Sequence, residues 1–109
     1  GLSFGGYHAT RISANDPRYA LCAVMGANHV WGRRQRERVK NEGENPVPHY
    51  WDHVMWVFGF DNRDAFLDYA DQITLDGQVE KIRVPFLIIT ADEEKVLGKN
   101  YGDIRKQIK

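Results

Sequence analysis

The stretch Gly1-Leu2-Ser3-Phe4-Gly5 (residues 1–5, GLSFG) decides the expected fold. Its form, G-x-S-x-G, is typical of a reactive serine on a sharp turn between a strand and a helix. Such a turn is tight, so the residues two before and two after the serine must be small, and Gly1 and Gly5 meet that need. A chance cluster of loop glycines is the alternative interpretation, but the helical pattern that follows at once favours the turn.

A serine on this turn would lie at a helix N-terminus, where partial positive charge favours a developing anion. The backbone N–H of Phe4 would be one donor to an oxyanion, and Gly6 would let the helix approach a sheet closely. The pattern predicts a helix over residues 4–15, which Asp16-Pro17 ends because the residue before a proline avoids the helical region. Four side chains are expected near one face of this helix: Phe4, His8, Ala9 and Ile12.

Two short apolar runs predict strands. Residues 20–25 (ALCAVM) lie between a proline-bearing turn and Gly26, and residues 84–89 (VPFLII) follow a charged connection. Both runs suit strands that are buried on two faces. Pro85 stands near the start of the second strand, where a missing ladder donor is tolerated. Two such strands separated by helices indicate a parallel sheet and the α/β fold class.

Helices are expected between and after these strands. A charged helix is predicted over residues 30–40 and an aromatic helix over residues 49–58. Asp61 or Asn62 would cap a further helix over residues 63–73. The apolar stripe of that helix consists of Phe66, Leu67, Ala70 and Ile73. The remaining elements are a partly helical connection over 74–82 and a final helix over 99–109, with Tyr101, Ile104 and Ile108 on one side.

The composition is that of one small globular domain. The 109 residues are enough for a single core, and 42% apolar with 28% charged residues excludes a disordered chain. Fifteen basic and fifteen acidic residues cancel, so we expect no nucleic-acid partner and no anionic membrane surface. Cys22 is the only cysteine, which excludes an intramolecular disulfide. Neither a membrane-length apolar run nor a signal-peptide pattern is present, so a cytoplasmic location is expected.

Residues 1–31 (GLSFGGYHATRISANDPRYALCAVMGANHVW) resemble the α/β-hydrolase superfamily. They look most like the branch that includes dihydroxypseudooxynicotine hydrolase, fungal heptaketide-shortening pigment hydrolases and the FrsA-like esterases. The strongest part of the resemblance is GGYHATRISANDPR followed by an apolar strand and GAN. That branch's pattern of residues also continues in HYWDHVMWVFGF and RDAFLDYADQITLDGQVEKIRVPFLIIT. The resemblance implies an incomplete α/β-hydrolase fold: part of a parallel sheet with flanking helices over 1–109, and a helical, lid-like insertion at about 30–74.

The same resemblance implies roles for particular residues. Ser3 would be the nucleophile, and the Phe4 N–H would donate to the oxyanion. In this family the triad's acid follows the next strand in a pattern like H-G-x-x-D. Here the segment reads Thr90-Ala91-Asp92-Glu93-Glu94, which places Glu94 at the acid position. Because Thr90-Ala91 departs from His-Gly, Asp92 is a second candidate and a solvated acidic loop is the alternative.

The triad's histidine follows the acid in this superfamily, yet no histidine occurs after His53. His8 lies about one helical turn from Ser3, and His29 lies in the loop after the first strand, where it could contact a substrate or serve only the loop. His49 and His53 are one turn apart, but without a third ligand a surface pair is favoured over a metal site. We therefore expect no cofactor or metal, and no turnover by this chain alone.

Two further patterns have competing interpretations. Four aromatic side chains at helical spacing could line an acyl or polyketide pocket, or pack in a core: Trp31, Trp51, Trp56 and Phe58. Packing is favoured, although Trp31 together with His29 is kept as a candidate substrate contact. Residues 32–40 (GRRQRERVK) hold five basic residues and one acidic residue. The neutral chain favours a solvated lid helix over a nucleic-acid surface.

Two functions follow from these patterns. The first is a serine hydrolase that acts on a C–C bond next to a ketone, or on an ester, in a small molecule such as a polyketide. The second is a non-catalytic remnant or interaction module of the same fold. Because the strand expected before Ser3 is missing, we expect the sequence to be the later half of a larger domain. Exposed strands predict that the isolated chain is unstable or self-associates.

Overall fold

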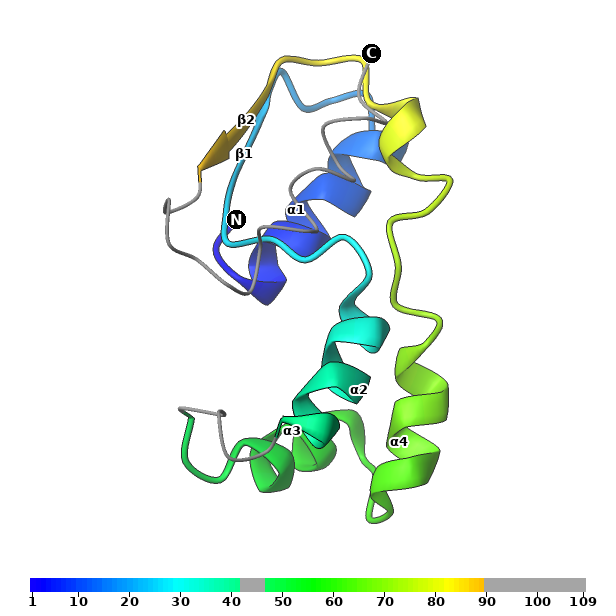
Figure 1. Ribbon diagram of the computed structural model, residues 1–109. Coiled ribbons are helices and arrows are strands. Elements are labelled where there is room, and N and C mark those ends of the chain that lie inside the picture. The colour runs from blue at the N-terminus through cyan, green and yellow to red at the C-terminus, as the bar shows by residue number, and fades with distance from the viewer. Residues whose placement is uncertain (42–46, 90–109) are drawn as a thin grey trace. The chain divides into compact units, whose positions relative to one another are not determined.

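The computed structural model describes residues 1–41 and 47–89 (Figure 1). The elements in chain order are α1 (Phe4–Asn15), β1 (Cys22–Met25), α2 (Trp31–Lys40), α3 (Tyr50–Phe58), α4 (Arg63–Ala70), the 3-10 helix η2 (Val79–Lys81) and β2 (Phe86–Ile89). They form two compact units: unit 1 comprises Gly1–His29 with Leu75–Lys109, and unit 2 comprises Val30–Thr74. The chain is thus a mixed α/β protein with a small sheet.

The sheet of unit 1 is parallel, as the sequence predicts. β1 and β2 run in the same direction, with Met25 opposite Ile89. On the other edge of β1, Leu2 forms a parallel bridge with Met25. The Met25 N–H donates to the Gly1 carbonyl at 2.9 Å, and the Ser3 N–H donates to the Met25 carbonyl at 2.8 Å. β1 therefore lies between β2 and the short extended segment that leads into α1.

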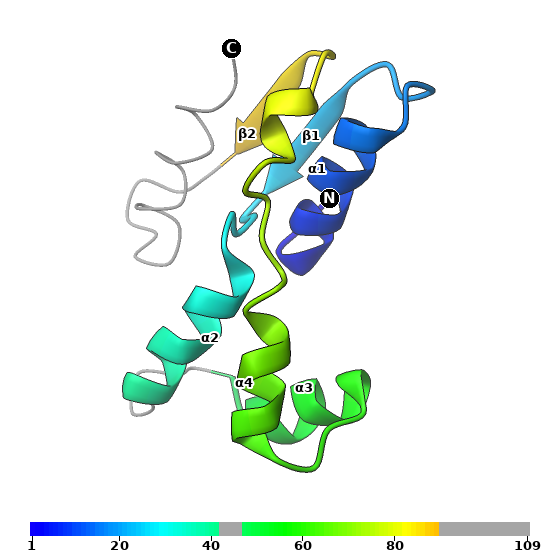
Figure 2. The same ribbon diagram turned by 90° about the vertical axis from the view of Figure 1, so that its right-hand side faces the viewer.

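The expectation that both strands are buried on two faces is wrong for the residues described. α1 packs against β1 and covers one face of the sheet (Figure 2). Cys22 and Val24 on that face are buried, and Phe86 and Ile88 are half-buried beside them. The side chains that alternate with them point the other way, and the exposed apolar ones near this opposite face are Leu21, Met25, Leu87 and Ile89. Alternation of burial in both strands is the pattern of a sheet covered on one side only.

Helix α1 has the predicted bounds but a different buried face. Its buried residues are Gly6, Tyr7 and Thr10, whereas His8 is exposed and Ile12 keeps 46% of its surface. Thr10 can be buried because its hydroxyl donates to the Gly6 carbonyl at 2.8 Å, which satisfies the polar group within the helix. The inward face therefore holds Gly6, Tyr7 and Thr10, and of the four residues predicted to share a face, Ala9 packs against the sheet core.

Unit 2 consists of α2, α3 and α4, close to the helices predicted for the central segment. The unit spans Val30–Thr74. Asn62 is the cap of α4, since its Oδ1 accepts a hydrogen bond from the Ala65 N–H at 2.9 Å. The apolar stripe of the sequence, Phe66, Leu67, Ala70 and Ile73, is buried, although α4 itself ends at Ala70.

Two sequence predictions lie outside the described residues: the helix over residues 99–109 and the acidic loop that contains Asp92 and Glu94. Over residues 1–41 and 47–89, no helix combines the length and apolar character needed to cross a bilayer.

Candidate active site

Ser3 has the most unusual backbone conformation near the turn. It is the residue before α1, with φ 53° and ψ −124°, and its side chain makes no capping hydrogen bond to the helix. Positive φ is uncommon for a residue with a side chain, and a conformation outside the main allowed regions costs about 1–3 kcal/mol. Such strain persists only where the surroundings enforce it, and it is concentrated at functional sites.

Hydrogen bonds on both sides of Ser3 hold this conformation. The Ser3 N–H is bound to the Met25 carbonyl, and the Ser3 carbonyl accepts from the Gly6 N–H at 2.9 Å. The N-terminal ammonium of Gly1 donates to the Ala23 carbonyl at 2.6 Å. The chain therefore enters the turn as an extended segment beside β1 and leaves it as a helix. This strand–turn–helix path is the structure that the G-x-S-x-G motif requires.

The three glycines of the turn have different roles. A Cβ at Gly1 would lie 2.2 Å from the Gly5 carbonyl oxygen, so Gly1 must be a glycine, as predicted. A Cβ at Gly6 would lie 2.7 Å from the Cβ of Ala27, so Gly6 allows the close approach that the sequence predicts. A Cβ at Gly5 meets nothing within 4 Å among the described residues. The expectation that Gly5 must be small is therefore wrong for this part of the chain.

Phe4 is the first residue of α1, so its backbone N–H belongs to the first turn of the helix, next to Ser3. Its ring lies 5.5 Å from the ring of Tyr7 and 4.5 Å from that of His8, measured between centroids. These contacts run along the helix surface.

His29 is buried rather than presented to a substrate. Only 1% of its surface is exposed, and its Nε2 lies 2.7 Å from Oδ1 of Asp76. Its carbonyl accepts a hydrogen bond from the Leu75 N–H at 2.8 Å. Both the side chain and the backbone of His29 therefore tie the loop after β1 to the segment at Leu75–Asp76, which favours the loop role over the substrate contact.

Trp31 belongs to the core of unit 2. It is 5% exposed, and its ring packs against Phe58 at 5.6 Å and against Phe66 at 6.0 Å. Trp51 also contacts Phe66, at 6.4 Å. Trp56 differs from these, since 77% of its surface is exposed. Packing, the interpretation that helical spacing favours, therefore explains three of the four aromatic residues of the predicted pocket.

The basic residues of α2 are largely engaged within unit 2. Arg36 donates to Asp71 at 2.7 Å and to Asp68 at 2.9 Å, and these bonds raise the pKa of Arg36 and lower that of Asp71. Arg34 pairs with Glu37 at 2.9 Å, and the guanidinium of Arg38 lies 4.3 Å from the ring centre of Tyr50. These contacts agree with a solvated helix whose charges are compensated locally.

The remaining histidines lie on α1 and at α3. His49 is exposed and lies 3.7 Å from Asp52, and the parts of the chain that the structure describes hold no group of three or more metal-binding side chains.

Asp76 is the residue that sequence reasoning missed. It stands 47 positions from His29, and nothing in the local sequence marks the pair.

Comparisons of the chain with models of protein families, with curated proteins and with solved structures found no match.

Proposed function

We propose that the chain carries the nucleophile turn of a serine hydrolase with the α/β-hydrolase fold. The observation that supports this most is the backbone of Ser3, which has a strained positive φ between an extended segment and the first turn of α1. Gly1 and Gly6 occupy the positions where the turn leaves no room for a side chain. The G-x-S-x-G motif, the backbone conformation of Ser3 and the lack of room for side chains at Gly1 and Gly6 thus all support a nucleophile turn at Ser3.

The proposed reaction begins with attack of Ser3 Oγ on the carbonyl carbon of an ester or a ketone. The Phe4 N–H stabilises the oxyanion that forms, together with a second donor from elsewhere in the fold. The bond from the carbonyl carbon to the leaving oxygen or carbon then breaks, and the leaving group takes up the serine proton. Water hydrolyses the acyl-serine and restores the hydroxyl. The substrate is a small molecule, an ester or one with a C–C bond next to a ketone.

The reaction needs a base that the described residues do not offer to Ser3. No hydrogen bond joins the Ser3 hydroxyl to a histidine within residues 1–41 and 47–89. His29 is buried with its Nε2 on Asp76, and the His8 ring lies against Phe4. The proposal therefore leaves the base unassigned and names Glu94 or Asp92 as the acid that would orient it.

Covalent labelling tests the proposal. The protein expressed from its complete gene is treated with a fluorophosphonate, and the modified residue is located by peptide mass spectrometry. Ser13 is the matched control, because it is the only other serine in the chain and its hydroxyl donates to the Ala9 carbonyl within α1. We expect label on Ser3 in the wild type and in Ser13→Ala, and none in Ser3→Ala. Label that persists in Ser3→Ala would refute the nucleophile assignment.

A second assay measures turnover of an activated aryl ester. The 109-residue chain is expected to show none that depends on Ser3, because the described residues offer Ser3 no base. The protein from the complete gene is expected to hydrolyse the ester and to lose this activity in Ser3→Ala.

A non-catalytic interaction module of the same fold is the second candidate function. The observation in its favour is the apolar face of the sheet that the described elements leave exposed, with Leu87 58% and Ile89 41% exposed. Such a surface favours association with another chain. Size-exclusion chromatography separates the two candidates: an interaction module self-associates or binds a partner whether or not Ser3 is present, and it takes up no label.

A further inference from the structure

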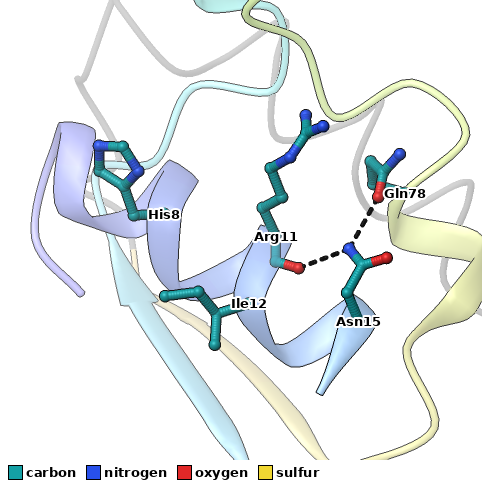
Figure 3. Close-up of a pocket in the computed structure, with 5 residues that line it drawn as sticks. All are labelled: His8, Arg11, Ile12, Asn15 and Gln78. Atoms are coloured by element: carbon teal, nitrogen blue, oxygen red, sulfur yellow. Dashed lines mark hydrogen bonds between the residues drawn. The ribbon is translucent and has the colours of Figure 1, made fainter.

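We propose that a pocket on the exposed side of α1 binds the phosphate group of a small phosphorylated molecule. The pocket has a volume of about 390 Å³, and Figure 3 shows the residues that line it: His8, Arg11, Ile12, Asn15 and Gln78. Neither Ser3 nor Phe4 belongs to this lining, so the proposal is independent of the hydrolase assignment.

Two segments far apart in the sequence build the pocket. The four residues from α1 follow one another at helical spacing and therefore share one face of the helix. Gln78 approaches from the segment that precedes η2, and its Oε1 accepts a hydrogen bond from Asn15 Nδ2 at 2.8 Å (Figure 3). This bond fixes the opposite wall relative to the helix.

Other side chains hold the polar groups of the pocket in place. The His8 ring packs against Phe4 and, at 5.4 Å between centroids, against Tyr7. Arg11 Nη1 donates to the Tyr7 hydroxyl at 3.0 Å, and Tyr7 itself is buried. A guanidinium and an imidazole that are already ordered lose less conformational entropy when a ligand binds.

Among the described residues, cationic side chains lie in and beside the pocket. None of the lining residues is acidic, and Lys81 Nζ lies 3.5 Å from Asn15 Oδ1, which places a second permanent cation at the rim. Because a 3-10 helix has three residues per turn, Gln78 and Lys81 share one side of this segment, and Glu80 is rotated away from them.

Two other carboxylates of the described residues in this part of the chain each have a partner of their own. Asp16, which follows the helix, is paired with Arg18 at 2.7 Å, and this hydrogen bond lowers the pKa of Asp16. Asp76 is paired with His29 at 2.7 Å. Within the part of the chain that the structure describes, an anion in the pocket would therefore meet two cationic side chains, Arg11 and Lys81.

A phosphate group fits this donor set better than a carboxylate does. His8, Arg11 and Gln78 line the pocket and can each donate a hydrogen bond, and a phosphate monoester offers three terminal oxygens where a carboxylate offers two. The volume leaves room for the rest of a small molecule beside Ile12, the one apolar residue of the lining.

The experiment is an NMR titration of the ¹⁵N-labelled 109-residue chain. The probes are inorganic phosphate and phenyl phosphate, with acetate as the carboxylate comparison and potassium chloride added to equal ionic strength. We expect saturable shifts of the Arg11 side-chain N–H and of the Asn15 and Gln78 amides with both phosphates, and weaker ones with acetate. Arg11→Gln should weaken binding by about tenfold or more, the effect of one charge-assisted hydrogen bond. Arg33→Gln, an exposed arginine of unit 2, is the charge-matched control and should bind as the wild type does.

Three results would overturn the proposal. Shifts that do not saturate with either phosphate would show that there is no site. Equal affinities in Arg11→Gln and Arg33→Gln would show only a response to net charge. Equal affinities for acetate and phosphate would refute the assignment of the ligand class.

Discussion

Replacing Gly32 with alanine should destabilise unit 2, although alanine is the better helix former. A Cβ at this position would lie 2.1 Å from the carbonyl oxygen of Ala70 and 2.8 Å from the Cα of Asp71. The first distance is about 1.3 Å below the 3.4 Å at which ordinary van der Waals contact begins. Because these atoms are backbone, α2 and α4 must move apart, and the Trp31–Phe66 contact beside them would loosen.

Two opposing effects determine how much Gly32→Ala changes the free energy of unfolding. Alanine gains about 1 kcal/mol over glycine in a helix interior. Overpacking a close contact typically costs about 1–3 kcal/mol and more where the backbone must shift. At an overlap this large we expect the steric effect to dominate, with a net loss of about 1–3 kcal/mol.

All three tryptophans, Trp31, Trp51 and Trp56, lie in unit 2, so their fluorescence during urea unfolding reports on this unit. The midpoint should fall in Gly32→Ala while the slope m is unchanged. Gly5→Ala is the matched control, because Gly5 is also helical but has open space where a Cβ would be. Followed by circular dichroism, this variant should be as stable as the wild type or up to about 1 kcal/mol more stable. A Gly32→Ala variant as stable as the wild type would refute the close packing of α2 on α4.

Three further predictions concern a cap, a titration and the strained serine. Asn62→Ala should lower the stability of unit 2 by about 1 kcal/mol because the cap of α4 is lost, whereas Asp61→Ala should have little effect; equal urea midpoints for the two variants would contradict this. Burial raises the pKa of Tyr50 despite the nearby charge of Arg38, so the folded state keeps the phenol proton longer than the unfolded state does. Stability should therefore be complete below about pH 10 and fall as the pH rises through the folded pKa, and Tyr50→Phe should remove that slope in melts at stepped pH. Ser3→Gly should stabilise the chain by about 1 kcal/mol, because glycine accepts a positive φ without strain. Ser13→Gly, within α1, should destabilise the chain instead. If calorimetry finds Ser3→Gly to be the less stable of the two variants, the turn at Ser3 is not strained.

Short-range signals in the sequence determined the elements and the serine turn. Helix α1 has the predicted bounds because the turn before it and the Asp16-Pro17 break after it act through neighbouring residues. Both strands lie within the predicted apolar runs and pair in parallel. The choice between Asp61 and Asn62 as a cap needed the structure, since both residue types favour that position. The role of Ser3 as a nucleophile remains a proposal that the turn supports.

Contacts between distant residues decided the rest. α4 ends at Ala70 rather than at Ile73 because the Ile73 carbonyl accepts the Trp31 N–H at 3.0 Å, which takes the chain out of the helix. The buried face of α1 depends on Ala27 meeting Gly6, and the burial of His29 depends on Asp76, 47 residues away. The sequence by itself determined the elements because caps, prolines and apolar periodicity act over a few residues. Only the tertiary structure decided which surfaces meet, because a contact across tens of residues leaves no periodic pattern in the chain.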